Sequence, residues 1–388
     1  MNLGEATHRA LLVGGSRIKK PARLRAAGAG HVISRKEVSE MVSRYDAKRL
    51  SVATLASHTA LQIAHGAKKE GLGTIVVGPR DRLSFYAEFG HLIDEFVEVS
   101  SWSSLCDEEV ERRLRELNAI VIPHGSFVEY VGLSCAEQLE VPLFGLRPLF
   151  RVEAEQRRKM ELLSSAGIPI PRIYEMGEEL ERPAIVKMPG AKGGRGYFLA
   201  RSRAEVEEGL RRAVEEGLLR DASEALIQEY VVGVPAFFHF FRSVVRGRLE
   251  LTGADIRYEA NLDGLRRLPP SLAEGIEPSF VVVGNVPLTL RESLLPIVVE
   301  YGRRFVEATR ALDPSGIVGP FCLESVITDE LEIVVFEFSG RIVAGTNLYV
   351  AGSPYSWLYW DEPMSVGRRI AREIREAADR GALEVVVS

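Results

Sequence analysis

The stretch "IVKMPGAKGGRGYFLA" (Ile185–Ala200) places four glycines, two lysines and one arginine between two apolar segments. Glycine-rich backbone with basic side chains is typical of phosphate-binding loops, because bare N–H groups can approach phosphate oxygens closely. The common helix-opening motifs do not fit, since no Ser or Thr follows a lysine and "YFLA" (Tyr197–Ala200) predicts a strand. We therefore expect two strands joined by a phosphate-binding loop. The alternative is an ordinary glycine-rich hairpin tip.

Composition limits the class of protein. A chain of 388 residues is long enough for two or three domains, and its net charge of -5 gives no broad electrostatic reason to expect nucleic-acid binding. No apolar run approaches the ~18 residues of a membrane span and no signal-peptide pattern opens the chain, so we expect a cytoplasmic protein that binds no membrane. The three cysteines, Cys106, Cys135 and Cys322, lie far apart, so neither a zinc site nor a disulfide framework is expected.

Three regions differ in pattern along the chain. Residues 1–30 are basic and rich in Ala and Gly, which predicts a disordered tail or upstream sequence included by a misassigned start. Residues 31–150 alternate short apolar strands with helices, which predicts a doubly wound parallel sheet. Residues 151–388 mix helices and strands as an α+β domain, with a subdomain around the glycine loop at about 180–235.

Polar residues follow two strands of the predicted parallel sheet. The segments "ASHT" (Ala56–Thr59) and "PHGSF" (Pro123–Phe127) stand at the carboxyl ends of strands, where ligands bind in such sheets. These positions make His58 a candidate for function. His124 is a weaker candidate, because a lone histidine is more often a structural hydrogen-bonding residue.

The segment "FCLESVITDELEIVVFEFSGR" (Phe321–Arg341) predicts a hairpin with its turn in "TDELE" (Thr328–Glu332). Glu324 and Glu337 lie about equally far from that turn, so they should be near-opposite neighbours on the two strands. Two adjacent carboxylates repel each other unless a cation lies between them, and Mg²⁺ prefers carboxylates together with phosphate oxygens. The alternative is that both glutamates face solvent.

Further candidates carry weaker signals. Lys187 ends an apolar strand and is either at its wet end or directed at an anion, while Lys192 and Arg195 could fold over a phosphate or be solvated loop charges. In "IQEYVVGVP" (Ile227–Pro235), main-chain groups after Glu229 could read an adenine edge, although an ordinary strand end is equally compatible.

Polar residues near the end of the sequence complete the candidates. Considered singly, Arg257, Glu259, Asn261 and Asn285 are interpreted as turn or cap groups. A basic, amide-rich loop directly after Glu337 suits phosphate or anionic substrate binding. Its candidates are Ser339, Arg341, Thr346 and Asn347.

Lys187, the glycine hairpin loop, "QEYV" (Gln228–Val231) and the late acidic pair, in that order, resemble the ATP-grasp ligases. Longer blocks such as "LASHTALQIAHGAKKEG" (Leu55–Gly71), "VIPHGSFVEYVGL" (Val121–Leu133), "GNVPLTLRESLLP" (Gly284–Pro296) and "GRRIAREIREA" (Gly367–Ala377) are similar to the archaeal formate-dependent phosphoribosylaminoimidazolecarboxamide (AICAR) ligases. The resemblance extends from about residue 32 to the C-terminus.

The resemblance implies an α/β doubly wound (pre-ATP-grasp) domain that binds substrate, followed by an α+β ATP-grasp domain. It implies an ATP-dependent C–N ligase that converts ATP, formate and AICAR into ADP, phosphate and formyl-AICAR (FAICAR) through formyl phosphate, in purine (IMP) biosynthesis. It also implies a homo-oligomer, and ATP and Mg²⁺ as cofactors with Mn²⁺ as a substitute cation.

Matched position by position, the resemblance assigns three groups of residues. AICAR would be contacted by His58, Ser126 and Asn285. ATP would be contacted by Lys187, Lys192, Gly193, Gly194, Arg195, Gly196, Glu229, Tyr230, Val231 and Glu259. Mg²⁺ would be held by Glu324 and Glu337, beneath a glycine lid that excludes water from the labile formyl phosphate.

Two departures from the family pattern lie close to these positions. Gly340 stands where the family leads us to expect Ala, and Glu324 stands where some relatives carry Gln. The rival hypotheses are an ATP-grasp ligase that joins a different carboxylate and amine, and a non-catalytic nucleotide-binding protein. Retention of both glutamates favours an enzyme.

Overall fold

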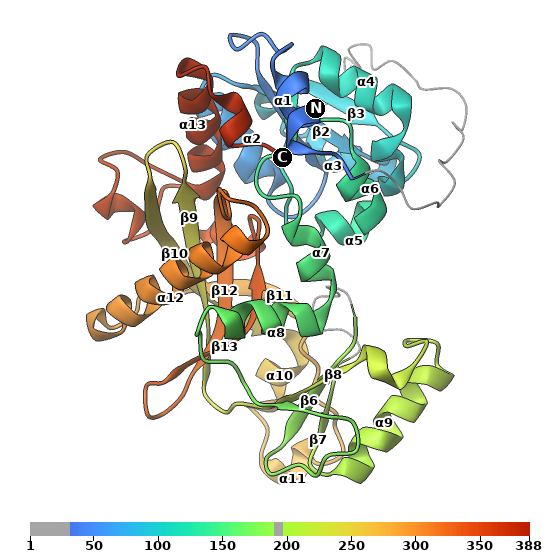
Figure 1. The fold of residues 1–388 in the computed structure, drawn as a ribbon. Helices are drawn as coiled ribbons and strands as arrows, with labels where there is room; N and C mark the ends of the chain where they lie inside the picture. The colour runs from blue at the N-terminus through green and yellow to red at the C-terminus, as the bar shows by residue number, and fades with distance from the viewer. Residues whose placement is uncertain (1–31, 190–196) are drawn as a thin grey trace, which may run out of the picture.

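The computed structural model describes residues 32–189 and 197–388 (Figure 1). The basic segment 1–30 and the loop residues Lys192, Gly193, Gly194, Arg195 and Gly196 lie outside the described residues, so the expectations placed on them stay predictions. None of the described helices is long and apolar enough to cross a membrane.

A four-stranded parallel sheet forms the N-terminal part, in the order β3-β2-β1-β4. Its strands are β1 (Ser51–Leu55), β2 (Gly73–Gly78), β3 (Glu95–Glu98) and β4 (Ala119–Val121). The accompanying helices are α1 (Arg35–Val42), α2 (Ala60–Lys69), α3 (Arg80–Ala87), α4 (Glu108–Glu116), α5 (Phe127–Val131) and α6 (Leu133–Gln138). The central strands are apolar and buried, because helices cover a parallel sheet on both faces. The predicted α/β fold is confirmed.

A five-stranded antiparallel sheet follows, in the order β11-β10-β9-β12-β13. Its strands are β9 (Val234–Ser243), β10 (Arg248–Glu259), β11 (Val282–Pro287), β12 (Gly319–Ile327) and β13 (Ile333–Ser339). The helices of this part are α7 (Leu149–Ala154), α8 (Gln156–Ser165), α10 (Ala260–Leu265), α11 (Pro270–Ala273) and α12 (Leu295–Ala308). The predicted hairpin is confirmed as the pair of β12 and β13.

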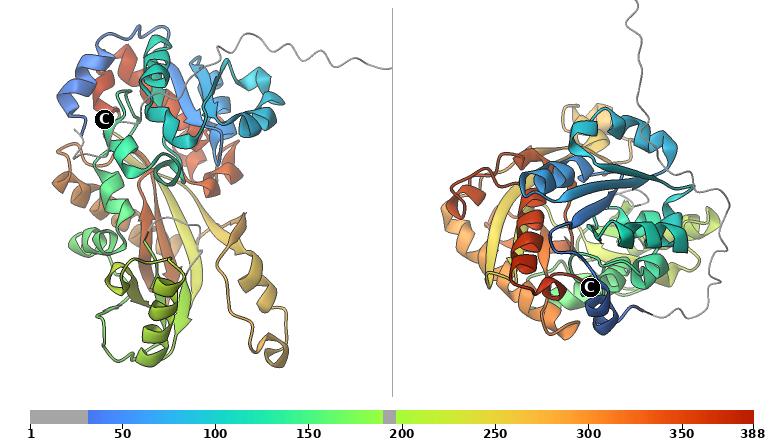
Figure 2. Two further views of the ribbon diagram at one scale, coloured as in Figure 1. Left: turned by 90° about the vertical axis from the view of Figure 1, so that its right-hand side faces the viewer. Right: turned by 90° about the horizontal axis from the view of Figure 1, so that it is seen from above.

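A smaller four-stranded sheet carries the glycine-rich stretch, in the order β5-β8-β6-β7. Its strands are β5 (Ile173–Tyr174), β6 (Ala184–Lys187), β7 (Phe198–Ala200) and β8 (Leu226–Glu229), and α9 (Arg203–Glu215) packs against it. Antiparallel pairing of β6 with β7 confirms the expected strand on each side of the loop. Figure 2 shows the long strands of the five-stranded sheet running between the two smaller sheets.

The last helix, α13 (Val366–Asp379), packs against α2 of the N-terminal part (Figure 1). The two backbones touch, since a Cβ added to Gly66 would lie 2.2 Å from the Arg368 nitrogen and one added to Gly367 would lie 2.4 Å from the Gln62 oxygen. Only glycine allows so close an approach. The division of the chain at about residue 150 stays a prediction, and the end of the chain returns to the first sheet.

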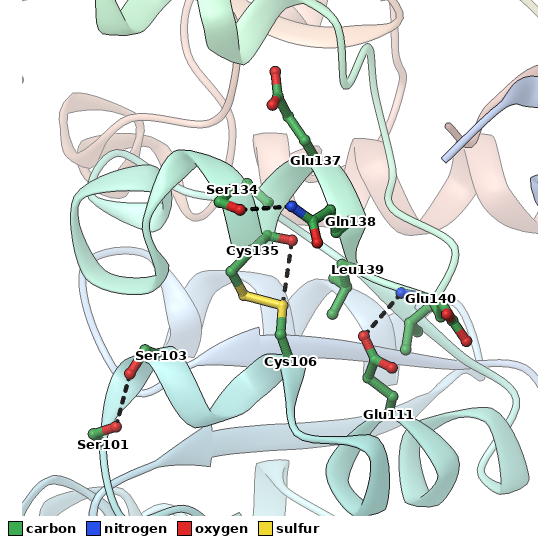
Figure 3. The surroundings of a disulfide bond; sticks show 12 residues. Ser101, Ser103, Cys106, Glu111, Ser134, Cys135, Glu137, Gln138, Leu139 and Glu140 are labelled. Carbon is green, nitrogen blue, oxygen red and sulfur yellow. Dashed lines mark hydrogen bonds between the residues drawn. A yellow bond between two sulfur atoms is a disulfide. The ribbon is translucent and has the colours of Figure 1, made fainter. Parts of the chain in front are cut away.

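The expectation that the cysteines form no disulfide is wrong. Cys106 and Cys135 are joined, with their Cα atoms 5.8 Å apart, and the bond ties the turn Trp102–Cys106 to α6 (Figure 3). No local pattern indicates this pair, because 29 residues separate the two cysteines and only the folded chain brings them together. Cys322 is free and buried.

We predict that the double substitution of Cys106→Ser and Cys135→Ser lowers the melting temperature, with a loss of about 2–4 kcal/mol in the free energy of unfolding. The cross-link restricts the unfolded chain, and this restriction disappears in the variant. The measurement is thermal unfolding followed by circular dichroism, with and without a reductant. A reductant should lower the melting temperature of the wild type and leave that of the variant unchanged; equal melting temperatures for oxidised wild type and variant would contradict the prediction.

Candidate functional site

A cavity of about 750 Å³ is lined by residues from all three sheet regions. The N-terminal part contributes His58 and Ser126, and the small sheet contributes Lys187 and Glu229. The five-stranded sheet contributes the two predicted metal carboxylates. The other predicted residues on its wall are Tyr230, Val231, Glu259, Asn285, Ser339 and Arg341.

One wall of the cavity follows the strand register of the five-stranded sheet. Asp255, Phe237, Glu324 and Glu337 are successive cross-strand partners on β10, β9, β12 and β13. Direct partners project on the same face of a sheet, so these side chains form one transverse row. The predicted pairing of Glu324 with Glu337 is confirmed. The solvent-facing alternative is wrong, because Glu324 is only 3 % exposed and both glutamates line the cavity.

Each carboxylate of the pair has a cationic partner. The Arg257 guanidinium lies 2.9 Å from Glu324 and 4.0 Å above the centre of the Phe237 ring, and Lys159 forms an ion pair with Glu337. Burial acts to raise the pKa of Glu337, but the charges of Lys159 and Lys187 outweigh it and lower that pKa. The surrounding cations therefore favour the ionised form of Glu337.

Lys159 was not among the residues predicted from the sequence, and the interpretation of Arg257 as a turn or cap group is wrong. Lys159 is 2 % exposed and shares the buried stripe of α8 with Gln156, Met160 and Leu163. The i, i+3, i+4, i+7 spacing of that stripe was a readable signal that this lysine faces inward. No such pattern marked Arg257. Its partner Glu324 lies on β12, which is far from β10 along the sequence.

Lys187 ends β6 as a buried cation on the cavity wall. Its ammonium donates a hydrogen bond to the Phe336 carbonyl oxygen at 3.2 Å and lies 4.9 Å from the centre of the Phe336 ring. Burial lowers the pKa of Lys187 to about 8, although the charge of Glu337 acts in the opposite direction. Of the two interpretations given to this lysine, the one in which it is directed at an anion fits its burial.

His58 and Ser126 meet beyond the carboxyl ends of β1 and β4, at the edge of the sheet where the sequence placed His58. The Nε2 atom of His58 lies 2.5 Å from the Ser126 hydroxyl, and the His58 backbone has a positive φ of 47°. Such a conformation is strained for a non-glycine residue and often marks a functional site. Partial burial and the charge of Arg341 lower the pKa of His58. His124 is fully buried behind His58 and does not line the cavity.

Arg341 holds the loop that carries Ser126. Its guanidinium donates to the carbonyl oxygens of His124, at 3.0 Å, and Gly125, at 2.5 Å, and forms a buried ion pair with Glu153. The Gly340 N–H also donates to Glu153, at 2.8 Å. A Cβ on Gly340 would lie 2.2 Å from a methyl carbon of Leu149, so an alanine at this position would require the Leu149 side chain to move.

The opposite end of the cavity contains Glu229, Tyr230, Val231 and Glu259. The N–H groups of Glu229 and Tyr230 donate to the carbonyl oxygens of Arg172 and Pro183, which fixes the strand end against its neighbours. Burial and the nearby charge of Asp263 raise the pKa of Glu259.

Some predicted residues do not reach the cavity. Thr346 is buried and donates to the Val343 carbonyl oxygen, and Asn347 accepts from Gln62 and donates to the His58 carbonyl oxygen. These contacts hold the segment Ala344–Tyr349 against α2. Asn261 lies within α10 rather than in a turn or at the cap, and its side chain donates to the Glu277 carbonyl oxygen.

Comparison with known proteins finds relatives that carry the same name. Residues 52–174 match a family described as "Protein of unknown function (DUF1246)", and residues 205–388 match one described as "Domain of unknown function (DUF1297)". A protein of Ignicoccus hospitalis named 5-formaminoimidazole-4-carboxamide-1-(beta)-D-ribofuranosyl 5'-monophosphate synthetase is 57% identical over 350 residues, covering 90% of this chain and 99% of the relative. A protein of the same name from Sulfolobus acidocaldarius is 54% identical over 337 residues, covering 87% and 99%.

Solved structures show the same fold. The crystal structure of an IMP biosynthesis protein, PurP, from Thermococcus kodakaraensis is similar with a TM-score of 0.69 and 33% identity, over 87% of this chain and all of that one. The ADP complex of N5-carboxyaminoimidazole ribonucleotide synthetase is similar with a TM-score of 0.59 at 16% identity, over 84% and 77% of the two chains. The expected ATP-grasp fold is confirmed.

We predict that Glu153→Ala destabilises the protein by about 3–5 kcal/mol, because it leaves the buried guanidinium of Arg341 without its carboxylate partner. The measurement is the shift in thermal unfolding. The matched control is Arg211→Ala, which removes an arginine from ion pairs on the exposed face of α9 and should barely change the melting temperature. Equal shifts for the two variants would show that the Glu153–Arg341 pair does not hold this loop.

Proposed function

The chain belongs to the family of the 5-formaminoimidazole-4-carboxamide-1-(beta)-D-ribofuranosyl 5'-monophosphate synthetases, and we propose that it formylates AICAR to FAICAR with ATP and formate in IMP biosynthesis. It is an ATP-dependent C–N ligase. The observation that carries the proposal is the single cavity that joins His58 and Ser126 to Lys187, Glu324 and Glu337. A nucleotide acceptor and a phosphoryl donor could therefore meet in it.

The ATP end of the cavity is formed by the two later sheets. Glu229, Tyr230, Val231 and Glu259 would hold the adenosine, with Glu259 next to the ribose hydroxyls. Lys187 would contact the phosphates as a buried cation, and phosphoryl transfer depends mainly on such positioning and charge neutralisation. Lys192, Gly193, Gly194, Arg195 and Gly196 would complete this contact, as the family resemblance implies.

Glu324 and Glu337 would hold Mg²⁺, or Mn²⁺ in its place. The residues fit such an ion, because two cross-strand carboxylates line the cavity and the charges of Lys159 and Lys187 lower the pKa of Glu337. No group of three or more His, Cys, Asp or Glu side chains suited to a metal occurs among the described residues, so phosphate oxygens would supply further ligands. The ion when bound supplies positive charge to the phosphate oxygens.

The acceptor end of the cavity belongs to His58, Ser126 and Asn285, which would orient AICAR. Formate oxygen would attack the γ-phosphorus with loss of ADP, and the 5-amino nitrogen of AICAR would then attack the formyl carbon with loss of phosphate and a proton. Formyl phosphate reacts readily with water, so enclosure of the cavity is a functional requirement. Ser339 donates to Glu324 at 3.0 Å and Arg341 holds the Ser126 loop, so both would act by positioning. The cytoplasmic location and the homo-oligomer stay predictions.

We predict that the purified protein forms ADP and FAICAR when incubated with ATP, formate, AICAR and Mg²⁺. Chromatographic detection of both products is the measurement, and omission of formate or AICAR is the control. ADP formation with another carboxylic acid, but not with formate, would favour a ligase with different substrates. Binding of ATP without any turnover would favour a non-catalytic nucleotide-binding protein.

We predict that Glu337→Gln lowers kcat by about 10²-fold or more while the fold is retained, because the site loses one of its two carboxylates for the cation. The matched control is Glu330→Gln, an exposed carboxylate at the turn of the same hairpin, which should leave kcat unchanged. Turnover by the Glu337→Gln variant at the rate of the control would contradict the metal assignment. Circular dichroism verifies that both variants are folded.

A further inference from the structure

Three polar side chains form an unbroken hydrogen-bonded chain beside the cavity. Asp255 lies between the other two: its Oδ1 is 2.6 Å from the Nε2 of His239, and its Oδ2 is 2.6 Å from the Nδ2 of Asn285. His239 and Asp255 are 2 % and 1 % exposed, whereas Asn285 is partly exposed. Asp255 and Asn285 line the cavity and His239 lies behind them.

The positions of the three side chains follow from strand register. Asp255 pairs with Phe237 on β9 and with Pro287 on β11, so His239 and Asn285 are its diagonal neighbours on the two flanking strands. Gly345 leaves room for the Asp255 carboxylate, and Gly253 leaves room for the Tyr349 ring. A Cβ on Gly345 would lie 2.3 Å from Asp255 Oδ1, and His239 is paired with Gly253, whose added Cβ would meet the Tyr349 ring at 2.6 Å. The surrounding backbone therefore encloses the Asp255 carboxylate.

The chemistry of the central carboxylate fixes the direction of both hydrogen bonds. Burial acts to raise the pKa of Asp255, but the hydrogen bond and charge of His239, the hydrogen bond from Asn285 and the charge of Arg257 outweigh it and lower that pKa. An ionised carboxylate can only accept hydrogen bonds, so His239 Nε2 and Asn285 Nδ2 must both be donors. The amide of Asn285 is thereby held with its nitrogen towards Asp255.

We propose that His239 and Asp255 are positioning residues that hold the Asn285 amide so that its oxygen accepts a hydrogen bond from an N–H donor of the acceptor nucleotide. The proposal rests on the proposed function, in which AICAR is that nucleotide and carries both an amino and a carboxamide group. Without the Asp255 carboxylate, the Asn285 amide could flip. Its own N–H groups would then face the N–H donor of the acceptor nucleotide. Asp255 therefore selects for a donor on the substrate without touching it.

His239 has its own part in this arrangement. Its Nε2–H occupies one oxygen of Asp255, which leaves the other oxygen for Asn285. The Nδ1 atom of His239 has no hydrogen-bond partner among the described residues, so the ring is held by the Asp255 contact and by packing within the sheet. A side chain that keeps a donor at the Nε2 position should preserve the function of His239, and one that lacks it should not.

The test is a double-mutant cycle of Asp255→Ala and Asn285→Ala, read as the KM for AICAR with ATP and formate saturating. We expect each single substitution to raise this KM by about tenfold or more. Because Asp255 acts through Asn285, Asp255→Ala should add less than about twofold once Asn285 is already Ala. The KM for ATP should change by less than about twofold in all three variants. The proposal would be overturned if the effects of Asp255→Ala and Asn285→Ala on the KM for AICAR multiplied fully in the double variant. It would also be overturned if the KM for ATP rose as much as the KM for AICAR.

Further variants distinguish a loss of the positioning contact from a loss of the folded structure. Asp255→Asn keeps the shape of the side chain but loses the acceptor-only character, so it should raise the KM for AICAR with an unchanged melting temperature. His239→Gln retains a donor and should stay near wild type, whereas His239→Leu should not. The matched control is Thr252→Val, which removes a buried hydroxyl bonded to the His239 carbonyl oxygen in the same strand pair and should leave the KM for AICAR unchanged. An equal rise for Thr252→Val would reduce the His239–Asp255 pair to a general structural role.

Failure of this proposal is distinguishable from failure of the proposed function. If the wild type forms no FAICAR, the proposed function is wrong, and the cycle is then read by calorimetric binding of AICAR alone. Non-additive losses of AICAR affinity would still support the positioning role, whereas unchanged AICAR binding in Asn285→Ala would refute it.

Discussion

The register between β12 and β13 is the constraint on which the cavity depends. Side chains alternate between the two faces of a strand, so a slip of one residue would turn one glutamate of the pair away from the other. A bulge between Glu324 and Ser325 shifts the register directly after the residue that must face inward, and the pairing then continues to Ile327 opposite Ile333. Glu324 also pairs with Phe237, so the same register aligns β9, and through β9 it aligns Asp255 on β10. One hairpin thus sets the positions of polar groups on four strands.

Placing carboxylates on a partly buried wall carries an electrostatic cost, which the fold offsets with cations from separate elements. Lys159 comes from α8, Arg257 from β10 and Lys187 from β6. A buried carboxylate without such partners would be driven towards its protonated form. The polar wall therefore requires that three parts of the chain pack together, and its geometry depends on the whole fold more than on any one segment.

The sequence predicted the features that depend on local pattern. The pairing of Glu324 with Glu337 followed from equal distances to a turn, and the strands beside the glycine loop followed from apolar runs. The position of His58 at the carboxyl edge of a parallel sheet followed from the alternation of strands and helices. The sequence could not predict Arg257 with Glu324, the Cys106–Cys135 bond or the chain from His239 to Asn285. Those contacts join strands or helices whose relative placement no local pattern determines. Thr346 and Asn347 were placed near the cavity by their distance from Glu337 along the chain, yet that segment turns away to pack on α2.

The contact of α2 with α13 bears on how the protein is made. The surface of α2 that receives α13 carries Gly66, and its partner Gly367 is added roughly 15 to 60 seconds later at ~5–20 residues per second on the ribosome. The apolar side of α13, with Val366, Ile370 and Ile374, belongs to the same hydrophobic cluster as Val52 and Ile63 of the N-terminal part. The N-terminal sheet therefore cannot complete its own core while it emerges. The face of this sheet that α13 covers is therefore packed only after nearly the whole chain has been made.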